Sequence, residues 1–177
     1  MVVEVLLITG STRSGSTNTA ALRTAREVAP DGVTAVLHEG LADLPAFNPD
    51  DDVEPLPRAV AELRNRVAAA DAVLFCTPEY AGTLPGSFKN LLDWSIGGTE
   101  LNGKPVAWLN VAPEGRGDGA IGALTTVLRY LAVDLVEAAC GRLFVPREAV
   151  GPDGLVEDAG IRDGLREVLR TLAGRSA

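Results

Sequence analysis

The chain has 177 residues, of which 46% are hydrophobic and 23% charged, and its formal net charge is −8. This length and composition predict a single globular domain over residues 1–177 and exclude a disordered chain. The acidic balance argues against a duplex nucleic-acid partner, because no stripe of Lys and Arg is present to neutralise phosphates, and we expect no nucleic acid. No apolar run approaches the ~20 residues of a membrane-spanning helix, so we expect no membrane partner.

Runs rich in apolar and β-branched residues alternate with segments of helical periodicity. The predicted strands are Val2–Thr9, Val33–His38, Asp71–Pro78, Lys104–Val111 and a fifth between Val133 and Val145. The predicted helices are Ser16–Ala29, Arg58–Ala70, Pro85–Ile96, Gly119–Leu131 and Ile161–Leu172. Residues 39–57, rich in Pro and Asp, are expected to form one long surface loop. The alternation predicts an α/β fold, a doubly wound five-stranded parallel sheet with helices on both faces.

The cysteine and histidine content bears on location and metal binding. Two cysteines, Cys76 and Cys140, and the lack of a basic signal segment favour a cytoplasmic location. The cysteines lack CxxC spacing and the single histidine, His38, cannot head a His-rich site, so we predict no metal. His38 ends a predicted strand and is expected to face solvent.

Three loops of unusual composition follow the first, third and fourth predicted strands. They read GSTRSGSTN, PEYAGTLPG and APEGRGDGAIG. Ligands of doubly wound sheets bind beyond the carboxyl ends of the strands, at the switch point in strand order. One common strand order of doubly wound sheets is 2-1-3-4-5, and in that order the three loops are neighbours around the switch point. The sequence therefore predicts one binding crevice formed by the three loops.

The first loop has the features of an anion site. Because it enters a helix, its backbone N–H groups and the helix dipole favour a negative charge. Gly10 and Gly15 have the GxxxxG spacing of a nucleoside-triphosphate loop, but Ser16 stands where that loop needs lysine. The dinucleotide pattern GxGxxG is also absent. Hydroxyl groups and one arginine, Arg13, favour a terminal monophosphate. The alternative is a polar turn in which Ser16 caps the helix.

The second and third loops suit a flat ligand. Pro78, Tyr80 and free backbone amides around Ala81 and Gly82 can lie against a heteroaromatic ring and bond to its edge. The alternative is a rigid turn with Tyr80 on the surface. The third loop carries four glycines between Gly115 and Gly122, which allow the backbone to approach a ligand closely.

The stretches GSTRSGSTN and PEYAGTLPGSFKNLLDW resemble the two signatures of the NADPH-dependent FMN reductase family, approximately GSxRxxSxN and PEYxxxxPGxxKNxxDW. That family has a flavodoxin-like fold and includes flavin, quinone, azo-dye and chromate reductases. The resemblance covers residues 1 to about 172. It implies FMN as cofactor, with NADPH or NADH as hydride donor.

The resemblance also implies the residues of the FMN site. The phosphate would be held by Ser11, Arg13, Ser16 and Asn18, with the backbone amide of Thr17. The isoalloxazine ring would be lined by Pro78, Glu79, Tyr80, Ala81 and Gly82, and the third loop would add Pro113, Glu114 and Gly115. Many members carry Asn at the position of Ala81, so a side-chain donor is lost here.

The implied activity is transfer of hydride from NADPH or NADH to flavin N5. The reduced flavin would then reduce a small-molecule electron acceptor, such as a flavin, a quinone or an azo compound, in a ping-pong mechanism. No catalytic side chain is implied, because the cofactor carries out the chemistry. Members are commonly dimers or tetramers, which implies a homodimer or homotetramer with Lys89, Asp93 and Trp94 as interface candidates. Trp94 lies off the apolar stripe of its predicted helix, and the alternative for it is partial burial within the monomer. The 39–57 loop would border either the open flavin face or the subunit contact. Three alternatives remain: a flavodoxin-type electron carrier, a small-molecule kinase and a non-catalytic FMN-bound sensor.

Overall fold

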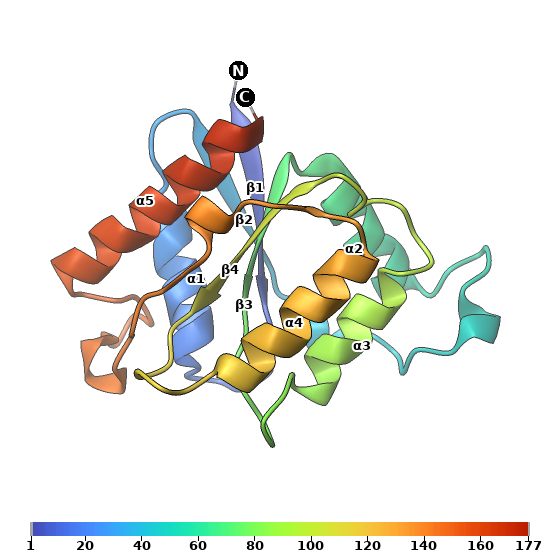
Figure 1. Ribbon diagram of the computed structural model, residues 1–177, viewed down its shortest axis with the longest axis horizontal. Coiled ribbons are helices and arrows are strands. Elements are labelled where there is room, and N and C mark those ends of the chain that lie inside the picture. Colours follow the sequence, from blue (N-terminus) through green and yellow to red (C-terminus); the bar gives the residue numbers. More distant parts are fainter. Residues whose placement is uncertain (1, 177) are drawn as a thin grey trace.

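A parallel sheet with strand order β2-β1-β3-β4-β5 runs through the centre of the computed structural model, which describes residues 2–176 (Figure 1). The strands are β1 (Val3–Thr9), β2 (Val33–His38), β3 (Ala72–Cys76), β4 (Pro105–Asn110) and β5 (Asp134–Leu135). This arrangement confirms the predicted order 2-1-3-4-5 and the flavodoxin-like topology. It places the ends of β1, β3 and β4 next to one another.

Helices cover both faces of the sheet. They are α1 (Thr17–Glu27), α2 (Arg58–Ala69), α3 (Gly86–Trp94), α4 (Asp118–Tyr130) and α5 (Ala159–Ser176). In Figure 1, α1 and α5 lie on one side of the sheet and α2, α3 and α4 on the other. The central residues of β1 are all apolar because both faces of the strand are covered: Val5 and Leu7 pack toward α1 and α5, whereas Leu6 and Ile8 pack toward α2–α4. Within residues 2–176, no helix combines the length and apolarity needed to cross a membrane.

The fifth strand position is occupied by two short pieces. β5 pairs with the start of β4, and β6 (Gly141–Arg142) pairs with its end. Between them the 3₁₀ turn η3 (Glu137–Ala139) leaves the sheet. Backbone bonds from Val136 N to Val106 O (2.8 Å) and from Leu143 N to Asn110 O (2.9 Å) keep both pieces aligned on β4. The interruption lies at an edge strand, where broken pairing is tolerated and limits association with other chains.

The 39–57 loop packs on α3 instead of standing free. It contains two 3₁₀ turns, η1 (Leu41–Asp43) and η2 (Pro49–Asp51). Trp94 is fully buried beneath it, with Nε1 donating to Pro45 O at 2.9 Å and its ring edge-on to Phe47 at 5.0 Å. Asn90 donates to Pro45 O and accepts from Phe47 N, both at 2.8 Å. The expectation that Trp94 lies at a subunit interface is therefore wrong, because the loop of the same chain already covers it.

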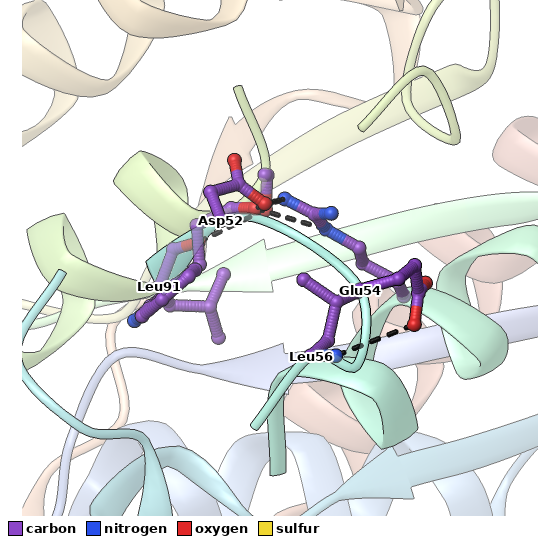
Figure 2. A network of polar contacts seen from close by, with 7 residues as sticks. Asp52, Glu54, Leu56 and Leu91 are labelled. Carbon is purple, nitrogen blue, oxygen red and sulfur yellow. Dashed lines mark hydrogen bonds and ion pairs between the residues drawn. The ribbon is translucent and has the colours of Figure 1, made fainter. Parts of the chain in front are cut away.

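A second anchor holds the far end of this loop (Figure 2). Arg64, on α2, donates from Nε (3.2 Å) and Nη2 (2.7 Å) to Trp94 O, and Nη2 also contacts Asp52 Oδ1 at 2.7 Å. Figure 2 shows Asp52 and, further along the segment, Glu54, whose carboxylate accepts from Leu56 N at 3.3 Å. The guanidinium thus satisfies the last carbonyl of α3 and ties the loop to two helices.

His38 is buried, with 6% of its surface exposed, so the expectation that it faces solvent is wrong. Its Nε2 is enclosed and has no hydrogen-bond partner among the described residues. The chain turns over the end of β2 at Gly40, where an added Cβ would lie 3.0 Å from the imidazole Cε1. Desolvation lowers the pKa of His38, against a smaller opposing effect of Glu62.

Candidate functional site

A cleft of about 720 Å³ opens at the carboxyl ends of β1, β3 and β4, where the three unusual loops meet. Four residues predicted to bind the cofactor line it: Thr17, Asn18, Pro78 and Glu79. The other six lie in the same two loops but outside the lining of the cleft: Ser11, Arg13, Ser16, Tyr80, Ala81 and Gly82. Pro113 and Glu114 of the third loop line it, whereas no residue of the 39–57 loop does.

The N-terminus of α1 presents unpaired donors to the cleft. Ser16 is the N-cap, with an extended backbone, yet its side chain makes no capping hydrogen bond. The first bonded helix amide is that of Ala20, which donates to Ser16 O at 2.9 Å. Among the described residues, nothing accepts from the amides of Thr17, Asn18 and Thr19, and the first turn contains no acid. This end of α1 is therefore suited to an anion.

Internal hydrogen bonds fix the shape of the first loop. Gly10 N donates to Cys76 O (2.8 Å), Ser11 N to Thr9 Oγ1 (3.3 Å) and Arg13 N to Ser11 Oγ (3.3 Å). Gly10 packs against Thr77, the residue that follows β3: a Cβ at position 10 would lie 2.2 Å from Thr77 Oγ1. This glycine is thus needed for close contact between the first two loops.

Arg13 lies along its own loop in this structure. Its Nη2 donates to Gly15 O at 3.3 Å and its Nε to Ser14 O at 3.5 Å, and the side chain is exposed. Both bonds are long and open to water, so they hold the guanidinium weakly. The positive charge therefore stands beside the N-terminus of α1 and remains free to turn toward an anion.

The second loop is a tight turn closed by two backbone bonds, Tyr80 N to Thr83 O (3.0 Å) and Thr83 N to Tyr80 O (3.1 Å). Both central residues have positive φ, +51° at Ala81 and +76° at Gly82. A side chain other than Asn or Asp at the first of these positions costs roughly 1 kcal/mol or more. The amides of Ala81 and Gly82 have no acceptor among the described residues, and Tyr80 is 53% exposed. The turn thus presents two backbone donors and an aromatic ring.

Glu79 joins the second loop to the third. Its Oε2 accepts from Ala120 N at 3.1 Å, in the first turn of α4, where the N-cap Gly117 has no side chain to do so. Gly119 packs so closely that an added Cβ would lie 2.1 Å from Gly82 O. The carboxylate of Glu79 is therefore committed to holding the two loops together, although part of the side chain lines the cleft.

One part of the cleft lining was not predicted from the sequence. It consists of residues 144–148, among which Phe144 is 49% exposed and Arg147 and Glu148 line the cleft. This segment is placed by Val145 N, which donates to Val111 O at 3.0 Å beyond β6. The sequence signal was weak because the interrupted edge strand before it has no sustained period. The apolar triplet Leu143–Val145 followed by Pro146 is the one local indication.

Arg142 braces the third loop from this side. It pairs with Asp118, and its Nη1 donates to Arg116 O at 3.0 Å. Asn110 completes the bracing, since its Nδ2 donates to Arg116 O at 3.0 Å and its Oδ1 accepts from Ala112 N at 2.9 Å. The glycine-rich loop is therefore held in one shape near the cleft.

Comparison with known proteins gives a consistent result. A model of a family described as NADPH-dependent FMN reductase matches residues 3–141. A quinone reductase of Pseudomonas putida is 33% identical over 184 aligned residues, which cover 99% of this chain and 94% of that protein. An NAD(P)H-dependent FMN reductase of Pseudomonas aeruginosa is 40% identical over 112 residues, 62% of this chain and 60% of that protein. The shorter match thus spans less than two thirds of its relative.

Solved structures share the fold. The flavoenzyme NAD(P)H:(acceptor) oxidoreductase FerB from Paracoccus denitrificans superposes with a TM-score of 0.78 at 26% identity, covering 99% of this chain and 97% of that one. An azoreductase from Bacillus anthracis, at 18% identity, has a TM-score of 0.61 over 98% of this chain and all of that one, which is a likeness of fold.

Proposed function

The chain belongs to the NADPH-dependent FMN reductase family, oxidoreductases that use FMN and NAD(P)H, and we propose that it reduces a flat small-molecule acceptor of the quinone, azo or flavin type by a ping-pong mechanism. The observation that carries the proposal is the open N-terminus of α1, whose unpaired amides lie beside the cleft that Pro78 and Phe144 also line. The near full-length similarity to a quinone reductase favours a quinone-type acceptor.

The donor set at α1 fits the phosphate of FMN. The amides of the first turn, the uncommitted hydroxyl of Ser16 and the amide of Asn18 supply donors, and Arg13 supplies positive charge nearby. A triphosphate would need a lysine or a metal at this loop, and the loop has neither a lysine nor an acid. We therefore assign the phosphate monoester to residues 11–18.

The second loop would hold the ring. Backbone amides of Ala81 and Gly82 would bond to its polar edge, Pro78 would pack on it and Tyr80 would cover one rim. Glu79 would act indirectly, by fixing the turn against α4. When bound, FMN supplies the chemistry itself, taking hydride from NADPH or NADH and passing electrons to the acceptor, so we propose no catalytic side chain.

We further propose that the chain acts in the cytoplasm as a homodimer or homotetramer. Its two thiols, Cys76 and Cys140, are unpaired, as is usual in a reducing compartment. Lys89 and Asp93 lie on the outer side of α3 and remain candidates for the contact, and Ile96, just beyond this helix, is 55% exposed. Light scattering on the purified protein measures the assembly, and a monomer at micromolar concentration contradicts it.

A spectrum tests the central proposal. Protein reconstituted with FMN should retain a flavin absorbance that NADPH or NADH bleaches without oxygen and that a quinone restores. Initial rates at varied donor and acceptor concentrations should give the parallel reciprocal plots of a ping-pong mechanism. Bleaching that requires a separate reductase protein would identify an electron carrier, which the charge of −8 would also suit. Failure to retain any flavin would overturn the proposal.

A further inference from the structure

Cys76 ends β3 next to the first loop, and its sulfur lies 3.2 Å from Asn18 Oδ1. Both residues are buried: Cys76 is fully buried, and Asn18 has 8% of its surface exposed. Burial raises the pKa of the Cys76 thiol, so the sulfur keeps its proton at neutral pH. The protonated thiol can therefore donate, and the structure places Asn18 Oδ1 against it, so the oxygen is the end of the amide that points at β3.

The other end of the amide is left for the cleft. An Asn side chain has an acceptor oxygen and a nitrogen with two donor hydrogens. With Oδ1 directed at Cys76, Nδ2 has no acceptor among the described residues, and Asn18 lines the cleft. The nitrogen thus adds two donors beside the unpaired amides of Thr17 and Thr19.

Without the thiol, Asn18 has a competing orientation. Asn18 is the second residue of α1, and a short polar side chain can accept from a nearby free backbone amide. Such a bond would occupy donors that an anion needs and would turn a partial negative charge toward it. The thiol is a weak donor, but it is positioned to remove this alternative because the backbone of Cys76 is itself bonded to Gly10 N at 2.8 Å.

We propose that Cys76 is a positioning residue for the FMN phosphate: its thiol holds the Asn18 amide so that Nδ2 and the first-turn amides of α1 face the anion. The inference rests on the proposed function, since it takes a phosphate monoester as the ligand at this helix. It assigns a role to a residue outside both sequence signatures. Cys76 is too deeply buried to touch the ligand and acts only through Asn18.

The test compares the Kd of FMN with that of riboflavin, which lacks the phosphate, by quenching of flavin fluorescence. Cys76→Ala should weaken FMN binding by about 3- to 10-fold, the value of one hydrogen bond, and leave riboflavin binding unchanged. Cys76→Ser should restore the FMN preference, because a hydroxyl also donates to Asn18 Oδ1. Cys140→Ala, which removes the half-buried second thiol, is the matched control and should change neither constant.

Two further variants separate positioning from packing. In an Asn18→Ala background, Cys76→Ala should cause no further loss of FMN preference, because the thiol acts through the missing amide. Asn18→Asp tests the orientation without altering the core: it keeps an oxygen for the thiol but turns a charged oxygen to the phosphate. FMN binding should therefore fall more than in Asn18→Ala.

The failures are distinguishable. Three results would overturn the role of Cys76 and leave the proposed function standing. The first is that Cys76→Ala weakens the binding of FMN and of riboflavin equally, and the second is that it weakens neither although the wild-type protein binds FMN. The third is that Cys76→Ala still weakens FMN binding in the Asn18→Ala background. Wild-type protein that binds neither flavin, or binds FMN no better than riboflavin, removes the phosphate from α1. That result overturns the inference, and absence of flavin binding overturns the proposed function as well.

Discussion

The first loop, residues 10–18, and the 39–57 loop follow adjacent strands, β1 and β2, yet their backbone and side-chain hydrogen bonds are used differently. At the end of the first loop and the start of α1, the amides of Thr17, Asn18 and Thr19 have no acceptor among the described residues, and Thr17 and Asn18 line the cleft. The 39–57 loop is tied to α3 and α2 by Trp94 and Arg64, and none of its residues lines the cleft. Open donors indicate a ligand site, whereas satisfied ones indicate a structural role.

Part of the second signature therefore holds the 39–57 loop in place. Its first part, from Pro78 to Gly82, faces the cleft or supports it. Its last part contains Asn90 and Trp94, whose side chains bind the backbone of Pro45 and Phe47. A motif that indicates a cofactor site can thus contain residues whose contacts only stabilise the fold.

The largest expected effect is a loss of folding stability when the contacts of the 39–57 loop are removed. Trp94→Ala should lower the free energy of unfolding by about 4 kcal/mol, because it empties a fully buried site and leaves Pro45 O without a donor. Urea denaturation measures it. Lys89→Ala, which removes an exposed ion pair with Asp93 on the same helix, should cost about 0.5 kcal/mol or less. If Trp94→Phe changed FMN affinity but not stability, the 39–57 loop would belong to the site.

Loss of the second anchor should be somewhat milder. Arg64→Ala should destabilise by about 3 kcal/mol, because Asp52 and Trp94 O lose their shared partner in a mostly buried setting. Arg64→Lys should recover only part of this, since an ammonium group lacks the planar fork. Denaturant melts of both variants give the difference, with exposed Arg58→Ala on the same helix as control. Equal stability of Arg64→Ala and Arg58→Ala would show that the anchor is not needed.

The first loop should show the opposite pattern, a binding effect without a stability effect. Arg13→Ala should weaken FMN by about tenfold, as expected for one charge-assisted hydrogen bond, and spare riboflavin. Its exposed side chain makes only long bonds to its own loop, so stability should change by less than about 0.5 kcal/mol. Flavin titration measures this, and Arg26→Ala, at the other end of α1, controls for charge. Equal loss of both flavins would place Arg13 away from the phosphate.

The smallest effect concerns pH and the start of the 39–57 loop. Burial lowers the pKa of His38, so below its ordinary value of 6.5 the unfolded chain binds a proton that the folded chain refuses. Stability should therefore fall as the pH drops through 6.5 toward the folded-state pKa. His38→Gln should remove this component, and the difference between the two stability curves isolates it. Parallel curves would mean that His38 is hydrated in solution.

The sequence alone determined the order of helices and strands and the three loops of unusual composition, and the flavodoxin-like order of the strands came with the family that the sequence resembles. The elements follow from local patterns: a strand covered on both faces carries a continuous apolar run, as at residues 5–8 of β1, and a surface helix repeats with a period near 3.6. The family followed in the same way, because the two signatures are contiguous stretches with fixed spacing.

Only the tertiary structure decided which side chains are buried and which polar groups remain unpaired. Trp94 lies off the apolar stripe of its helix and His38 at a strand end, yet segments distant along the chain cover both. The part of the cleft formed by residues 144–148 depends on an interrupted edge strand that β4 aligns. The orientation of the Asn18 amide depends on the thiol of Cys76, 58 positions away in the sequence. Burial and hydrogen-bond pairing are set by neighbours in space, and a local pattern cannot name those neighbours.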